Sequence, residues 1–274
     1  MRTEPIGLLV LLIGCSSSSP SPDARATSGA SGSSGSSGGS VSAQVAATAD
    51  DGGFIDYGTP YVNVNMWYGP VDFAESQYTN ACGPDDGSHY PQTIQSLYGN
   101  YLIGLDGQNI ADPQSHCDDC ARLTANGISI IAHVITYGIE NGVDAIDLSP
   151  QARSAIGLSN SDWTGTWQFV SCPTKAPIYY EFDGRDWSNT WYFRIWIRNH
   201  RLPVMSVESQ VGSAGWNAAQ QQSDGAWQSV SGIDYSPGFQ IRVTAIDGQQ
   251  IVDTIPALSS VNPAAPVEGQ ANFQ

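Results

Sequence analysis

Residues 190–204, TWYFRIWIRNHRLPV, have the alternating pattern of a β-strand that carries large side chains on both faces. The face expected to pack in a core carries Trp191, Phe193, Ile195 and Ile197. The opposite face carries Tyr192, Arg194, Trp196 and Arg198. Rings interleaved with guanidinium groups predict either a flat surface for a stackable ligand or a face covered by another sheet or domain. The strand alone leaves both readings open.

The rest of the chain extends this β pattern. Short runs of Val, Ile, Thr and aromatic residues alternate with clusters of Gly, Pro, Asn and Asp, whereas helical periodicity is scarce. A length of 274 residues allows two domains of ordinary size. The formal net charge of -16 makes nucleic acid an unsuitable partner.

The amino terminus carries an export signal. The apolar run 6–13 is too short to span a bilayer and ends at Gly14-Cys15, which is similar to a bacterial lipoprotein signal peptide over residues 1–15. A lipid on Cys15 would be the sole membrane attachment, at the cell surface or outer membrane; a plain secreted protein is the alternative. Residues 16–53, rich in Ser and Gly, are expected to form a disordered tether.

Four further cysteines are expected to form two disulfides, because an exported chain with an even number of them usually does so. They are Cys82, Cys117, Cys120 and Cys172. A metal site that uses His116 beside Cys117 and Cys120 is the alternative. The pairing stays open, since four cysteines allow three connectivities.

The folded part is expected to comprise one domain over residues 54–173 and a second over 174–274, with a hinge near Lys175. In the first domain, Ser149 and Pro150 predict the start of a short helix. The second has repeated turn signals between short strands, a pattern typical of a small β-sandwich.

Four segments, in order, resemble the bacterial expansins: AIDLSPQARSAIG (145–157), WYFRIWIRNHRLPVM (191–205), GAWQSVSGIDY (225–235) and IRVTAIDGQQIVDTIP (241–256). The resemblance implies a mainly β protein with a six-stranded double-psi β-barrel, followed by an immunoglobulin-like β-sandwich that binds cellulose.

The resemblance also implies an aromatic platform of three rings, Trp191, Tyr192 and Tyr235. The strand alternation adds Trp196 on the same face as Tyr192. Such rings suit a polysaccharide because the C–H faces of glucose are flat and apolar while its hydroxyl groups lie around the edge. Core packing is the alternative for Trp191 and Trp196.

In the first domain, Asp147 matches the acid that expansins need in the barrel groove; its position before a helix start offers a structural alternative. The family's second groove acid falls on Thr136, and its nearby aromatic residue on Gly138. Thr136, Trp67 and Tyr68 are further candidates for holding a glycan. Hydrolysis needs a second carboxylate, which Glu140 or Asp144 would have to supply, although solvated loop acids are the commoner explanation for both residues.

These features predict a non-hydrolytic, expansin-like protein that binds cellulose or another β-glucan of the cell wall and is expected to loosen it. It is expected to be a monomer that needs no cofactor and no metal. A weak family-45-like endoglucanase using Asp147 and a pure carbohydrate-adhesion lipoprotein are the alternatives.

Overall fold

The computed structural model describes residues 53–68, 81–83, 98–106, 110–139, 144–159, 164–183, 190–261 and 265–274. All of them belong to one compact unit, residues 44–274. Within these ranges no helix has both the length and the apolar character needed to cross a bilayer. Cys15 and the expected tether lie outside the described residues, so both remain predictions.

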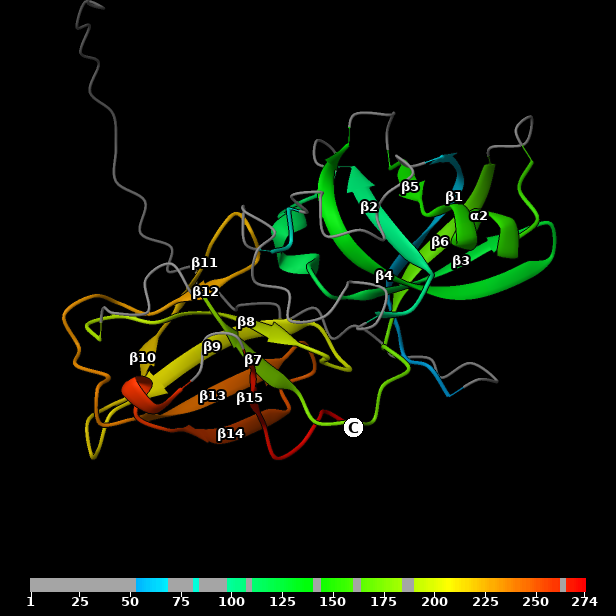
Figure 1. Ribbon diagram of the computed structural model, residues 1–274. Coiled ribbons are helices and arrows are strands. Elements are labelled where there is room, and N and C mark those ends of the chain that lie inside the picture. Colours follow the sequence, from blue (N-terminus) through cyan, green and yellow to red (C-terminus); the bar gives the residue numbers. More distant parts are fainter. Residues whose placement is uncertain are drawn as a thin grey trace, which may run out of the picture. The chain divides into compact units, whose positions relative to one another are not determined.

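The first part of the described chain is a closed β-barrel with strand order β1-β5-β2-β4-β3-β6 (Figure 1). Its strands are β1 (Asp56–Tyr68), β2 (Leu102–Asp106), β3 (Cys120–Ala125), β4 (Ile128–Ile139), β5 (Ile146–Leu148) and β6 (Thr164–Val170). Closure leaves none of these strands as an open edge. The expected barrel is therefore confirmed.

Alternation along the strands separates the barrel interior from its outer face. Met66 pairs with Ile146, and Leu105 pairs with the same residue from the other side. All three are completely buried in the main hydrophobic core. The residues next to them along each strand therefore point to the opposite face of the barrel. This alternation places the candidate groove residues.

The helical elements of the barrel are short. Helix α2 (Pro150–Ala155) begins after Ser149, whose Oγ accepts a hydrogen bond of 3.2 Å from the Ala152 amide. The cap thus satisfies an amide that would have no partner inside the helix, as the sequence predicts. A 3-10 helix, η1 (Pro113–His116), precedes β3.

The second part contains two facing sheets, with strand orders β10-β9-β13-β14 and β11-β12-β8-β7-β15 (Figure 1). The first sheet contains β9 (Val204–Gln210), β10 (Asn217–Ala218), β13 (Phe239–Ala245) and β14 (Gln250–Ile255). The second contains β7 (Tyr179–Phe182), β8 (Arg194–Arg198), β11 (Gln220–Gln221), β12 (Trp227–Gln228) and β15 (Val267–Glu268). A 3-10 helix, η3 (Leu258–Ser260), follows β14.

The strand predicted from Trp191 onwards begins later, at Arg194 in β8. Phe193, Ile195 and Ile197 are buried, as the alternation predicts. Trp191 precedes the strand in a turn and is exposed. It therefore does not pack in the core with the other residues of its predicted face.

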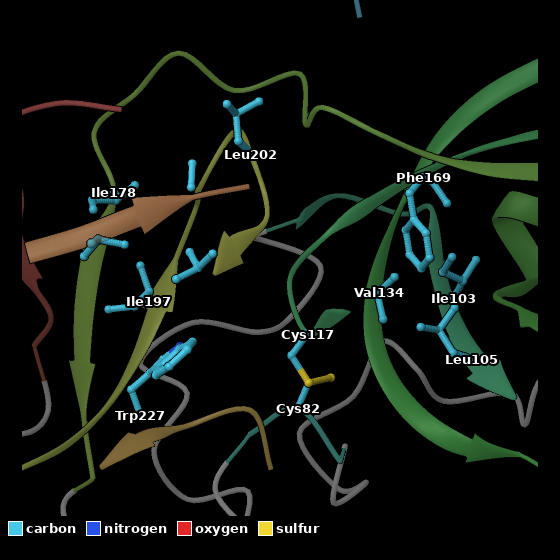
Figure 2. Packing of buried hydrophobic residues seen from close by; sticks show 14 of the residues in the cluster. Cys82, Ile103, Leu105, Cys117, Val134, Phe169, Ile178, Ile197, Leu202 and Trp227 are labelled. Atoms are coloured by element: carbon cyan, nitrogen blue, oxygen red, sulfur yellow. A yellow bond between two sulfur atoms is a disulfide. The ribbon is translucent and has the colours of Figure 1, made fainter. Parts of the chain in front are cut away.

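Side chains of the barrel and the sandwich contribute to one buried cluster, which includes Ile103 and Leu105 as well as Ile197 and Trp227 (Figure 2). The same figure shows the disulfide between Cys82 and Cys117. Barrel strands end at Val170 and sandwich strands begin at Tyr179, so the change of architecture occurs between these residues.

Candidate functional site

One row of residues crosses the outer face of the barrel over four neighbouring strands. Trp67 of β1 pairs with Asp147 of β5, which pairs with Gly104 of β2, which in turn pairs with Thr136 of β4. The row spans about 14 Å, because neighbouring strands lie about 4.8 Å apart. We call it the groove row. It brings together three of the candidate residues of the first domain.

Asp147 occupies the middle of the groove row and is only 4% exposed. Two residues further on, Ser149 Oγ donates to the Asn100 carbonyl and accepts from the Leu102 amide, at 2.8 and 3.2 Å. These bonds fix the end of β5 against β2. Asp147 is therefore carried by a rigid strand rather than a loop, which suits a residue that must hold one orientation.

A second carboxylate, Asp106, lies close to Asp147 and is absent from the sequence-based candidates. Its amide donates to the Ala145 carbonyl, which continues the β2–β5 register by two residues beyond Gly104. Asp106 and Asp147 are therefore diagonal neighbours on one face, with Cα atoms about 7–8 Å apart. Asp106 is 1% exposed. Its signal in the sequence is an acid that ends the apolar strand LIGLD.

The sequence-based candidates for the second carboxylate are two loop acids, Asp144 and Glu140. Asp144 has a left-handed backbone, with φ of 57°, and its carbonyl accepts a hydrogen bond of 3.0 Å from Trp167 Nε1. Burial and the charge of Asp144 raise the pKa of Tyr61 above its usual value. Glu140 lies outside the described residues.

Thr136 is at the end of the groove row, and its hydroxyl group already has a partner within the chain. Thr136 Oγ1 accepts a hydrogen bond of 3.1 Å from the amide of Ala81. Cys82, which follows Ala81, forms a disulfide with Cys117. The carbonyl of Cys82 accepts a hydrogen bond of 3.0 Å from Arg198 Nη1. The Thr136 hydroxyl group thus helps to hold residues 81–83 in place, and its contact with a glycan stays a prediction.

The remaining groove candidates are aromatic. The side chain of Trp67 is half-buried, so part of its ring faces solvent beside Asp147. The backbone of Tyr68 pairs with Leu148, but its side chain lies outside the described part of the structure. Gly138 has an exposed backbone position with a positive φ of 100°.

On the sandwich, Trp191 is the most exposed of the described aromatic residues, with 56% of its surface accessible. Tyr192 beside it is half-buried. The Trp191 carbonyl accepts a hydrogen bond of 3.2 Å from Gly232, and the Phe193 carbonyl accepts one of 3.0 Å from Ser229. Segment 229–232 therefore runs beside Trp191, and it brings Val230, which is 40% exposed, to the same region.

Tyr235, the third predicted ring of the platform, is completely buried. Its hydroxyl group lies 3.0 Å from Ser209 Oγ, and its ring packs edge-on against Phe193 and Phe239. The prediction that Tyr235 stacks on a glycan is therefore wrong for this structure. The Tyr235 amide donates to the carbonyl of Thr190, the residue before Trp191, at 2.8 Å, but the Tyr235 ring lies in the core.

Trp196 is also buried, at 1% exposed. Its Nε1 donates a hydrogen bond of 3.0 Å to the Asp224 carbonyl, and the guanidinium groups of Arg194 and Arg198 lie 5.2 and 5.7 Å from its ring centre. These contacts cover the second face of β8. The predicted extension of the platform by Trp196 is therefore wrong, and the covered-face reading of this strand is the correct one.

The cysteines form the two disulfides expected, Cys82–Cys117 and Cys120–Cys172. The two sulfur atoms of the second disulfide and a ring nitrogen of His133 all lie within 4.8 Å of one another. Oxidised sulfur is not a thiolate ligand, so this group does not suit a metal. Burial lowers the pKa of His133 to about 4, which favours the neutral ring.

No protein-family profile matches the chain. In sequence, it is 29% identical over 146 residues to Expansin-YoaJ of Bacillus subtilis, a match that covers 49% of this chain and 57% of that protein. It is 23% identical over 168 residues to Expansin-like protein 5 of Dictyostelium discoideum, a match that covers 59% of this chain and 69% of that protein. The first match thus spans less than two thirds of the Bacillus protein.

In structure, the chain is similar to the crystal structure of the Clavibacter michiganensis expansin without ligand, with a TM-score of 0.64 and 15% identity over 79% of this chain and 98% of that one. A variant of the Clavibacter protein in complex with cellohexaose gives the same TM-score at 14% identity, with the same coverage.

The closed barrel followed by a β-sandwich is the fold of the bacterial expansins. Together with the sequence matches, it makes this chain an expansin-like protein.

Proposed function

We propose that this protein binds cellulose or a related β-glucan without cleaving it, and loosens the packing of the polysaccharide by binding strain. The observation that carries the proposal is the exposed indole of Trp191, next to the half-buried ring of Tyr192. A large ring is costly to leave in water, whereas it stacks favourably on the apolar face of a glucose unit. The cellohexaose complex of the Clavibacter variant supports the same ligand class.

The groove row is proposed to contact the same polysaccharide through Trp67 and Asp147. The half-buried ring of Trp67 offers a second stacking surface beside a carboxylate that accepts hydrogen bonds from sugar hydroxyl groups. Thr136 is left out of this proposal because its hydroxyl group binds Ala81.

A pull-down on microcrystalline cellulose tests the proposal, with reducing ends assayed in the same tubes. Trp191→Ala is expected to weaken binding at least about fivefold, since one stacked ring contributes about 1–3 kcal/mol. Met205→Ala is the matched control, because Met205 is 59% exposed on the same sandwich and is not proposed to bind. Equal retention of the two variants would refute the role of Trp191.

A weak glycoside hydrolase is the second candidate, because Asp106 gives Asp147 a neighbouring carboxylate, although the two residues are only 1% and 4% exposed. Inverting hydrolysis uses two carboxyl groups about 6.5–9.5 Å apart, a range that diagonal neighbours on a sheet can meet. Release of soluble sugar by the protein, lost in both Asp106→Asn and Asp147→Asn, would support this candidate. No release by the unaltered protein would leave the non-hydrolytic proposal.

We also propose that the protein is exported, carries lipid on Cys15 and acts as a monomer. Two disulfides suit an oxidising compartment. Incorporation of a radiolabelled fatty acid that Cys15→Ser abolishes would support the anchor, and release of Cys15-containing protein without label would refute it.

A further inference from the structure

The basic side chains of the described structure differ in how their charges are compensated. Arg194 and Arg198 each bind two carboxylates, and Arg122 and Arg242 each bind one. Lys175 and Arg201 form no ion pair with any described residue. In a chain of net charge -16, a cation without a carboxylate neighbour is notable, because acidic residues outnumber basic ones by 26 to 10.

Both cations line the same pocket, which has a volume of about 480 Å³. Its walls come from four parts of the chain: residues 53–54, the connection 173–175, Arg201, and residues 272–274. Neither Trp191 nor Tyr192 lines it. The pocket is therefore separate from the surface proposed to bind cellulose.

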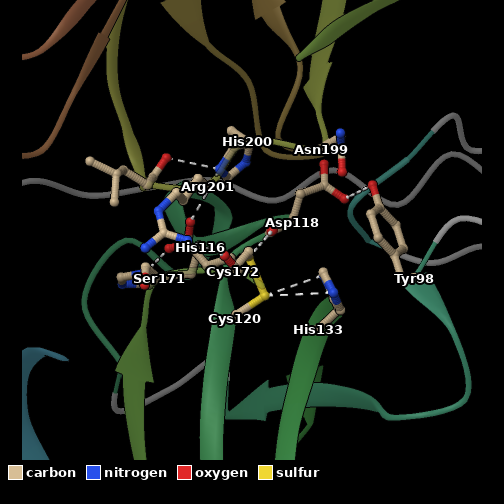
Figure 3. Close-up of a disulfide and its surroundings, with 12 residues drawn as sticks. Tyr98, His116, Asp118, Cys120, His133, Ser171, Cys172, Asn199, His200 and Arg201 are labelled. Carbon is tan, nitrogen blue, oxygen red and sulfur yellow. Dashed lines mark hydrogen bonds and ion pairs between the residues drawn. A yellow bond between two sulfur atoms is a disulfide. The ribbon is translucent and has the colours of Figure 1, made fainter. Parts of the chain in front are cut away.

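The guanidinium group of Arg201 donates to backbone carbonyl groups and forms no ion pair with a described acid. Its Nη1 donates to Cys172 O at 3.4 Å and its Nη2 to Gly53 O at 3.3 Å. Figure 3 shows Arg201 beside Cys172 and the Cys120–Cys172 disulfide. A guanidinium group has five N–H donors, so further donors remain for an anion.

Asn272, a neighbouring residue of the lining, is also held by hydrogen bonds. Asn272 Oδ1 accepts from the Arg201 amide at 2.9 Å, and Asn272 Nδ2 donates to the carbonyls of Ala176 and Asn199 at 2.6 and 2.8 Å. Asn272 is 8% exposed. A preformed wall with a positioned cation loses little ordering entropy when a ligand binds.

We propose that this pocket binds a carboxylated sugar, such as a hexuronate unit of an acidic polysaccharide. The two cations select an anion, with Arg201 suited to a planar carboxylate. The volume lies within the usual range of about 300–1,000 Å³ for organic ligands and far exceeds what an inorganic ion fills. Phe54 in the wall offers an apolar surface to the ring of the sugar.

Isothermal titration of the full chain with trigalacturonate tests the proposal, with cellotriose as an uncharged ligand of equal length. Trigalacturonate is expected to bind and cellotriose to show no heat at this site. Lys175→Gln is expected to weaken trigalacturonate binding about tenfold, because a charge-assisted contact is lost. Lys175 is exposed and makes no described hydrogen bond, so this change leaves the fold intact.

Three further variants separate charge from structure. Lys175→Arg keeps the charge and is expected to retain most of the affinity. Arg242→Gln removes the same charge from a residue that does not line the pocket, and is expected to leave trigalacturonate binding unchanged. Arg201→Lys keeps the second cation but loses the planar fork, so several-fold weaker binding is expected.

Any one of three results would overturn the proposal. The first is no trigalacturonate binding at millimolar concentration, and the second is equal affinity of Lys175→Gln and the unaltered protein for trigalacturonate. The third is that inorganic phosphate binds as tightly as trigalacturonate, which would indicate a general anion site. Cellulose pull-down of Lys175→Gln keeps the two proposals apart. Retained cellulose binding with lost trigalacturonate binding supports the pocket, whereas failure of Trp191→Ala to affect cellulose binding bears on the platform alone.

Discussion

The hydroxyl groups of Tyr235 and Ser209 lie 3.0 Å apart in the interior of the sandwich. Tyr235→Phe is therefore expected to lower the free energy of unfolding by about 1 kcal/mol, the usual net value of one hydrogen bond, and to leave cellulose binding intact. Urea denaturation and the pull-down measure the two effects. Lost binding by a variant of unchanged stability would instead place Tyr235 in the binding surface.

The buried guanidinium group of Arg198 joins two acids, Glu181 of the sandwich and Asp118 of the barrel part, at 2.7 and 2.5 Å. Asp118→Asn is expected to destabilise the protein by about 3–5 kcal/mol, because it leaves part of a buried charge uncompensated. Glu208→Gln breaks the half-exposed pair with Arg242 and is expected to cost less than about 1 kcal/mol. Similar losses in the two variants, measured by urea denaturation, would contradict the difference in burial.

The neutral state of His133 predicts a dependence of stability on pH. Burial lowers its pKa from 6.5 to about 4, against the charge of Asp118, which raises it; the nearby His200 also lowers it. Between pH 6.5 and 4 the unfolded chain binds a proton that the folded chain does not, so stability falls as the pH is lowered through this window.

His133→Phe keeps a ring next to Tyr98, whose ring centre lies 4.8 Å from that of His133. The difference in unfolding free energy between pH 7 and pH 4.5 is expected to be smaller in this variant than in the unaltered protein. An unchanged difference would show that groups other than His133 cause the acid sensitivity.

Gly225 lies against the disulfide that holds residues 81–83. A Cβ atom at this position would lie 2.8 Å from Cys117 Sγ, and the backbone has φ of 79°. Gly225→Ala is therefore expected to destabilise the protein by more than Gly248→Ala, which has a similar φ of 88° but open space around it. The difference, about 1–3 kcal/mol for an overpacked contact, isolates the effect of crowding in thermal unfolding. Equal losses would mean that the left-handed backbone alone is responsible.

Local signals in the sequence predict several parts of this structure. Capping chemistry predicts the role of Ser149, and the even number of cysteines in a chain expected to be exported predicts two disulfides. Alternation along the strand predicts that Ile195 and Ile197 point inward. The pairing of the cysteines does not follow, because it depends on contacts between residues 35 and 52 positions apart in the chain.

What covers a strand face is the main feature that the sequence leaves undetermined. Alternation places Trp196 opposite Ile195 but cannot reveal that Asp224 and two guanidinium groups close over its ring. Similarly, the motif that contains Tyr235 fixes its neighbours but not the direction of its side chain. Asp106 becomes a candidate only through its register with Ala145 and Gly104, which is a tertiary relationship.

Arg198 limits how this protein can be recombined with others. Because its charge is compensated partly by Asp118 of the preceding part, a sandwich fused to a foreign catalytic or binding module would inherit an ion without one of its counterions. A functional hybrid would have to carry an acid at the equivalent position or replace Arg198 by an apolar residue. Exchange of one half alone, without either of these changes, is therefore expected to lower the stability of the hybrid.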